Sequence, residues 1–154
     1  MLQRLKMEHR QILRIMDRVE TTLFSPEATE AVHIGEARWE TQYILRDHFA
    51  FKDAFVFRIL AASGRPKAVV TGRRLQAHGA AIRDAYRNHL LRWDPSDMHA
   101  SWDAYRAASL AMIRQLRTLV ETEKAELYPI LESEVAEVRP VAAPFFGLRK
   151  ATAG

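Results

Sequence analysis

The chain has 154 residues, of which 48% are hydrophobic and 27% are charged, and its net charge is +4. This composition is typical of a single globular domain and excludes a disordered chain. Cysteine is absent, which excludes disulfides, thiolate nucleophiles and zinc–thiolate sites.

Helical periodicity extends through most of the chain, and no strand pattern interrupts it. Four long helices with short connections favour an all-α, antiparallel up-down-up-down four-helix bundle over residues 1–138, followed by a C-terminal tail over residues 139–154. The breaks predicted between them lie at proline- and glycine-containing segments. The four predicted helices run from about Leu2 to Leu23, Thr29 to Ala62, Lys67 to Trp93, and Met98 to Glu137.

The apolar stripes of the first two predicted helices contain polar residues. On the first helix, His9 lies between Leu5 and Ile12 at helical spacing. On the second, His48 and Lys52 occupy consecutive turns of the stripe.

This second stripe is predicted to continue inward through Phe55 and Ile59. Phe49, Phe51 and Phe57 add aromatic residues on several faces of the same helix, which predicts an additional covered surface, either in a homodimer or under the C-terminal tail with Phe145 and Phe146.

The third and fourth predicted helices repeat this pattern. His78 lies on the third stripe, which is predicted to include Val70, and Glu123 lies in a near-heptad apolar row on the fourth. Pro129 is predicted to kink or break the fourth helix. The other three histidines do not lie clearly on a stripe and are predicted to be at the surface; they are His33, His89 and His99.

A bundle that buries all four stripes would bring polar side chains from every helix into one dry layer. Burying such groups is costly unless they are paired or bound to a metal. Histidine with carboxylate is a usual ligand set for iron, and bundle cores are a usual place for metal sites. The predicted metal ligands are therefore His9, His48, His78 and Glu123.

Four sequence elements, in order, resemble the hemerythrin-like family, also called HHE cation-binding domains. The elements are Met7-Glu8-His9, His48-Phe49-Ala50-Phe51-Lys52, Leu75-Gln76-Ala77-His78, and Leu119-Val120-Glu121-Thr122-Glu123 followed by Leu127-Tyr128-Pro129. The resemblance covers about residues 1–135 and implies a four-helix bundle with a di-iron centre served by two HxxxE pairs. In this chain Lys52 stands at the first glutamate position and Leu119 at the second histidine position.

These two differences leave two main interpretations of the site, besides a full di-metal site completed by other residues such as Asp53, Glu121 or a tyrosine. One is a single iron or zinc ion held by His9, His48 and Glu123, with His78 as a further ligand. The other is a metal-free layer in which the ammonium of Lys52 replaces the cation and pairs with Glu123. The resemblance therefore implies a sensor or interaction module with an altered di-iron site, or alternatively a non-haem iron or zinc protein that senses or carries metal, oxygen or nitric oxide.

Other classes of function have weaker support in the sequence. No nucleophile arrangement, phosphate-binding loop or cofactor fingerprint indicates an enzyme. The basic residues are dispersed and lack a nucleic-acid motif. No run approaches the about 20 apolar residues of a membrane span, and no signal peptide begins the chain. We therefore expect a cytoplasmic protein that is not an enzyme, with a protein partner or a second copy of itself.

Overall fold

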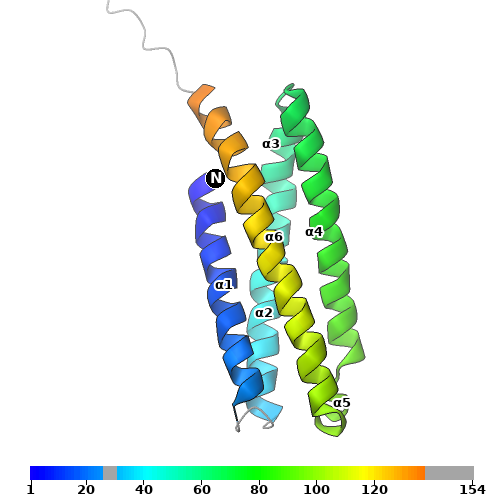
Figure 1. Cartoon of the computed structure of the whole chain (residues 1–154). Coiled ribbons are helices and arrows are strands. Elements are labelled where there is room, and N and C mark those ends of the chain that lie inside the picture. Colours follow the sequence, from blue (N-terminus) through cyan, green and yellow to red (C-terminus); the bar gives the residue numbers. More distant parts are fainter. Residues whose placement is uncertain (26–30, 138–154) are drawn as a thin grey trace, which may run out of the picture.

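The computed structural model describes residues 1–25 and 31–137, and all its regular elements are helical. The chain rises and descends repeatedly, so that neighbouring long helices are antiparallel (Figure 1). The all-α prediction is thus confirmed for these residues. The elements are α1 (Leu2–Phe24), α2 (Ala31–Phe51), the π-helix η2 (Lys52–Val56), α3 (Phe57–Ala62), α4 (Pro66–Arg92), α5 (Pro95–Ala100) and α6 (Trp102–Glu137).

Short segments with turn-forming residues separate α3, α4, α5 and α6. Gly64 has a φ of 69°, a left-handed conformation that glycine adopts without strain, and Pro66 begins α4. The Asp94 side chain accepts a hydrogen bond of 2.8 Å from the backbone N–H of Asp97 and so caps the N-terminus of α5. Ser101 then separates α5 from α6, where the sequence predicted one uninterrupted helix.

The predicted second helix is continuous but contains a π-helical turn. Such a turn adds one residue to the α-helical repeat and therefore rotates the following side chains around the axis. Phe55 and Ile59, which were predicted to face inward, are 53% and 42% exposed. Val56 and Leu60, one residue later in each case, are fully buried. The prediction for these positions was wrong because it assumed an unbroken α-helical period.

Two further details of the sequence prediction are corrected. Val70, expected on the inner stripe of α4, is 66% exposed. Helix α6 continues through Pro129, so the predicted break is absent, while the predicted kink stays a prediction. In the phenylalanine-rich segment, Phe49, Phe51 and Phe57 are buried and Phe55 is exposed, so the extra covering by a second copy or by the tail stays a prediction. The tail with Phe145 and Phe146 lies outside the described residues.

A buried polar layer separates two apolar clusters of the core. On α1, Leu5 belongs to one cluster and Ile12 to the other, with His9 between them. On α6, Leu119 and Leu127 belong to opposite clusters, with Glu123 between them. The fold thus places polar residues from different helices at one height of the bundle. None of the described helices is both long and apolar enough to cross a membrane.

Candidate metal centre

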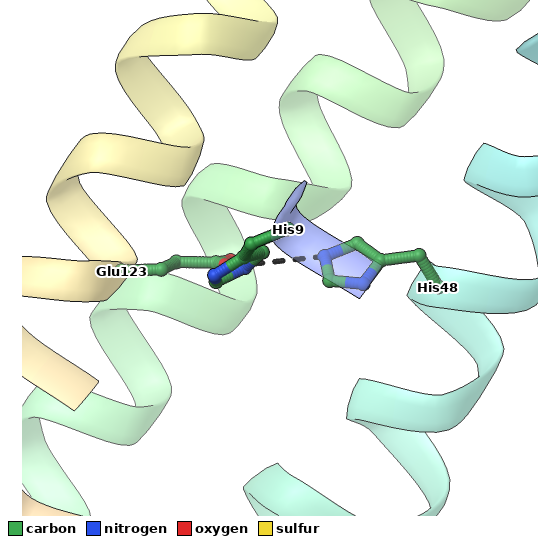
Figure 2. A group of neighbouring side chains, drawn as sticks. All are labelled: His9, His48 and Glu123. Carbon is green, nitrogen blue, oxygen red and sulfur yellow. Dashed lines mark hydrogen bonds and ion pairs between the residues drawn. The ribbon is translucent and has the colours of Figure 1, made fainter. Parts of the chain in front are cut away.

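His9, His48 and Glu123 form a buried group at this height of the bundle. They come from α1, α2 and α6, and their side chains point toward one another (Figure 2). One potential ligand atom from each residue lies within 4.8 Å of the others. Two imidazoles and one carboxylate are therefore arranged in the described chain as a metal-binding triad would be.

Hydrogen bonds hold the His9 ring at both nitrogens. Nε2 lies 2.8 Å from Oε2 of Glu123, and Nδ1 lies 2.6 Å from the hydroxyl of Tyr128. Burial lowers the pKa of His9 more than the neighbouring Glu123 raises it, so the ring is neutral near pH 7. Since an ionised carboxylate can only accept, the Nε2–H donates to Glu123 and Nδ1 accepts from Tyr128.

Burial and the Glu123 charge together raise the pKa of Tyr128 to about 12. The phenol therefore keeps the proton that it donates to His9. This contact fixes the orientation of the ring and leaves its Nε2 directed toward Glu123.

The His48 ring is held from one side only. Its Nδ1 lies 2.9 Å from Oε2 of Glu8, whose other oxygen accepts a 2.8 Å hydrogen bond from Nε of Arg4. Burial acts to raise the pKa of Glu8, but His48 and Arg4 outweigh it and lower the pKa. Glu8 is therefore ionised and Nδ1 of His48 is the donor.

The second nitrogen of His48 has no hydrogen-bond partner although it is buried. This Nε2 lies 3.7 Å from Oε2 of Glu123. In a neutral ring whose Nδ1 carries the proton, Nε2 presents a lone pair toward a carboxylate oxygen, which also presents lone pairs. Such a pair of acceptors is unfavourable in a dry interior unless a proton or another cation lies between them.

Lys52 contacts the other oxygen of Glu123. Its ammonium forms an ion pair with Oε1, and both side chains are at most 1% exposed. The ammonium also lies 4.7 Å from the centre of the Phe49 ring, within the range of a cation–π contact. The predicted contact between Lys52 and Glu123 is thereby confirmed.

Glu123 is ionised despite its burial. Burial acts to raise the pKa of this carboxyl group, but the interactions with His48 and His9 and the positive charge of Lys52 outweigh it and hold the pKa well below its usual range. The carboxylate thus has two sides: Oε1 neutralises a cation of the chain, and Oε2 faces the two imidazoles.

His78 is not brought to this group. It is half-buried and lines a surface depression between α4 and α6, together with Arg114 and Thr118. The next residue of α4, Gly79, faces the polar layer instead: a Cβ built on it would lie 3.6 Å from the Lys52 ammonium. Leu119 is 2% exposed and belongs to the apolar cluster beside the layer.

The sequence prediction did not identify the residues that support the triad. In the sequence, Glu8 and Tyr128 belong only to the family-like motifs, and Gly79 gives no sign of chemistry. Glu8 directly precedes His9 in the chain, and Tyr128 follows Glu123 by more than one helical turn. Glu8 and Tyr128 therefore both lie on the flank of an inner stripe rather than on the stripe itself. A search for polar residues flanking the stripe would have found both.

Comparison of the chain with protein-family models, with curated proteins and with solved structures gives no significant match. The resemblance to the hemerythrin-like family therefore remains a prediction from the sequence elements. What the structure shows, over residues 1–25 and 31–137, is an all-helical arrangement with a buried group of two histidines and one glutamate.

Proposed function

We propose that the polar layer binds one divalent transition-metal ion, with His9, His48 and Glu123 as its protein ligands, and that the protein senses or carries that ion or a small molecule bound to it. Two histidines with one carboxylate are a ligand set used for non-haem iron, and zinc accepts the same donors. This set leaves coordination positions open, where a bound ion can act as a Lewis acid or bind a further ligand.

The observation that carries the proposal is the unpartnered Nε2 of His48. It faces Oε2 of Glu123 at 3.7 Å, and Nε2 of His9 is hydrogen-bonded to the same oxygen. A cation among these three atoms would replace the repulsion between Oε2 and the Nε2 lone pair of a neutral His48 ring with attraction to both. His9 would ligate the cation through Nε2 after its proton has moved to Nδ1, the tautomer that metal-bound histidines adopt. The other ring nitrogens already have partners that can accept an N–H, as those of metal-bound histidines usually do. Glu8 accepts from Nδ1 of His48, and the hydroxyl of Tyr128 can accept from Nδ1 of His9 once that nitrogen carries the proton.

Charge limits the affinity of such a site. In the metal-free protein, the charges of Lys52 and Arg4 balance those of Glu123 and Glu8 when both histidines are neutral. A divalent ion adds two positive charges to a layer with little solvent to screen them. We therefore expect the ion to bind with modest affinity, and to bind more weakly at acidic pH, where protons compete with it for the imidazole nitrogens.

The test is metal analysis and calorimetric titration of protein purified without a metal-affinity tag. We expect one Zn²⁺, or one Fe²⁺ under anaerobic conditions, per chain. His48→Gln should weaken binding by at least about a hundredfold, whereas the matched variant of an exposed histidine, His99→Gln, should bind as the original protein does. Absorption of Co²⁺ in the same site would report nitrogen and oxygen ligands. The absence of binding at pH 8, or equal binding by His48→Gln, would refute the proposal.

A second candidate function is a metal-free interaction module, and the ion pair of Lys52 with Glu123 favours it. The ammonium already neutralises the carboxylate, so the layer does not require another cation. In this alternative a proton on Nε2 of His48 provides the missing interaction with Glu123. The function would then depend on the surface, where Trp39 is 69% exposed and stacks on Tyr43 at 5.7 Å.

This alternative is tested by sedimentation of metal-free protein over a range of concentrations, alone and with an interaction partner obtained by affinity capture. Trp39→Ser should weaken self-association or capture, while the exposed Leu91→Ser should not. A protein that stays monomeric, captures nothing and binds one metal ion would exclude the module and retain the metal site.

A further inference from the structure

A second polar cluster lies in the other half of the bundle, around a cavity of about 50 Å³. The residues that line it come from α1, α2, α4 and α6. Most of the lining is apolar, with Met16, Leu116 and Tyr105 among the contributing side chains. The lining also includes the polar residues Thr41, Ser109 and His89.

The cavity is separate from the candidate metal centre. On α1, Met16 follows His9 by seven residues, and on α2, Thr41 precedes His48 by seven. Seven residues of α-helix span about 10 Å. The buried side chain of Ile12 lies on α1 between the two levels. A ligand of the cavity would thus not contact the metal ligands.

Thr41 presents an unused hydrogen-bonding group to this cavity. The residue is only 5% exposed, and its hydroxyl oxygen has no hydrogen-bond partner. A buried hydroxyl without a partner is destabilising, so such groups are rare in folded proteins and often mark a place where a water or a ligand binds. This hydroxyl can both donate and accept a hydrogen bond.

Ser109 and His89 add a second polar group to the wall. The hydroxyl of Ser109 lies 3.3 Å from Nε2 of His89. Burial, with a smaller contribution from the Arg38 charge, lowers the pKa of His89 to about 4. The ring is therefore neutral near pH 7, and the direction of its hydrogen bond with Ser109 depends on the tautomer of the ring. Arg38, which also lines the cavity, donates to the backbone oxygens of Leu90 and Trp93, so these two N–H groups are already occupied without a ligand.

The size of the cavity limits what it can hold. An apolar cavity of about 150 Å³ accommodates benzene, whereas about 15 Å³ is the minimum for one water molecule. A volume of about 50 Å³ lies between these limits. It suits a molecule of about two to four non-hydrogen atoms.

We propose that this cavity is a binding site for a small neutral organic molecule with one hydroxyl or carbonyl group and a short apolar part, such as a short-chain alcohol. The hydroxyl of Thr41 bonds to the polar group of the ligand. The side chains of Met16, Leu116 and Tyr105 contact its hydrocarbon. The ligand is independent of any metal ion in the polar layer.

Methionine methyl groups provide a direct test. Two of the five methionines of the chain, Met16 and Met112, line the cavity, whereas Met7 and Met98 do not. In protein labelled with ¹³C at the methionine methyl groups, ethanol should produce saturable shifts of Met16 and Met112 only. A ligand with three non-hydrogen atoms reaches a Kd of about 0.5 mM at best.

Two variants of Thr41 distinguish the contribution of its hydroxyl to ethanol binding from the contribution of the cavity volume. Thr41→Val keeps the shape without the hydroxyl and should weaken ethanol binding about three- to tenfold. Thr41→Ile also fills the cavity and should abolish the saturable shifts. If the shifts in the original protein are linear in ethanol concentration, or if Thr41→Val binds ethanol equally well, the proposal is wrong. A cavity that retains an ordered water on Thr41 at saturating ethanol would also overturn it.

Discussion

Lys52 and Glu123 form an ion pair that is almost completely shielded from solvent, and only one oxygen of the carboxylate takes part in it. The other oxygen faces His9 and His48. One oxygen of Glu123 therefore pairs with the Lys52 ammonium, while the other is available, with the two imidazoles, to a metal ion. This arrangement makes the contribution of Lys52 to stability separable from its effect on metal binding.

Replacing Lys52 with methionine leaves a buried carboxylate without its cation. Removing one partner of a buried ion pair costs about 3 to 5 kcal/mol. We expect Lys52→Met to lower the free energy of unfolding of the metal-free protein by about this amount, measured by urea denaturation in the presence of a chelator.

The matched control is Lys6→Met, because Lys6 pairs with Glu132 across 3.3 Å at a solvent-accessible position. This change should alter stability by less than about 0.5 kcal/mol. The same Lys52→Met protein should bind Zn²⁺ more tightly than the original, since a repelling charge is gone. Equal stability of Lys52→Met and the original protein would show that the pair does not form.

Tyr128 acts on the site through His9. Tyr128→Phe removes the hydroxyl that lies 2.6 Å from Nδ1 and leaves the Nδ1–H of a metal-bound His9 ring without its acceptor. Loss of such a supporting contact typically costs about 10- to 100-fold in metal affinity. We expect this weakening in calorimetric titrations with Zn²⁺. Tyr43→Phe, which removes the hydroxyl of a tyrosine that is 48% exposed, should have no effect. An unchanged affinity of Tyr128→Phe would mean that His9 is not a ligand.

The sequence predicted the inner faces of α1 and α6 well. Both helices keep one α-helical period through His9 and Glu123, so the spacing of Leu5, Ile12 and Leu127 was sufficient to place the two polar residues inside. The prediction failed after Lys52 because hydrophobic spacing does not report a π-helical turn.

The α4 side of the layer could not be predicted from residue type alone. A histidine on an apolar stripe indicates chemistry, whereas a glycine gives no such signal. Here His78 lies in a surface depression, and Gly79 leaves room for the Lys52 ammonium. His89 was likewise predicted to be at the surface but is half-buried between the Tyr86 and Tyr105 rings, which come from two different helices. Such contacts depend on tertiary packing rather than on local sequence.

The two buried glycines of α4 should respond in opposite ways to alanine. A Cβ on Gly79 would lie 3.5 Å from Phe49 Cε1 and 3.6 Å from Lys52 Nζ, which are ordinary contact distances. Because alanine is the better helix former, Gly79→Ala should raise the free energy of unfolding by about 0.5 to 1 kcal/mol.

Gly72 provides the contrast on the same helix. A Cβ there would lie 3.0 Å from Cβ of Leu60 and 3.2 Å from its Cδ1. Such crowding in a packed core costs about 1 to 3 kcal/mol, which exceeds the gain in helix propensity. We therefore expect Gly72→Ala to be destabilising in the same urea experiment. If both variants were stabilised equally, the close approach of α3 and α4 at this point would be wrong.

His89 should make the protein sensitive to mild acid. Its pKa in the folded protein is about 4, below the value of 6.5 for a free histidine, because burial and the Arg38 charge disfavour the imidazolium. Between these values the unfolded chain takes up a proton that the folded chain does not, so the free energy of unfolding falls as the pH is lowered from about 6.5 to about 4.

His89→Phe keeps an aromatic ring between Tyr86 and Tyr105 and removes this titration. As the pH is lowered through that range, the free energy of unfolding of His89→Phe should therefore rise progressively relative to that of the original protein. Urea denaturation at several pH values measures this difference. Ser109→Ala, which removes the hydroxyl partner but keeps the titrating ring, should retain the pH dependence of the original protein. Parallel stability curves for His89→Phe and the original protein would show that His89 binds its proton equally well in the folded and unfolded states.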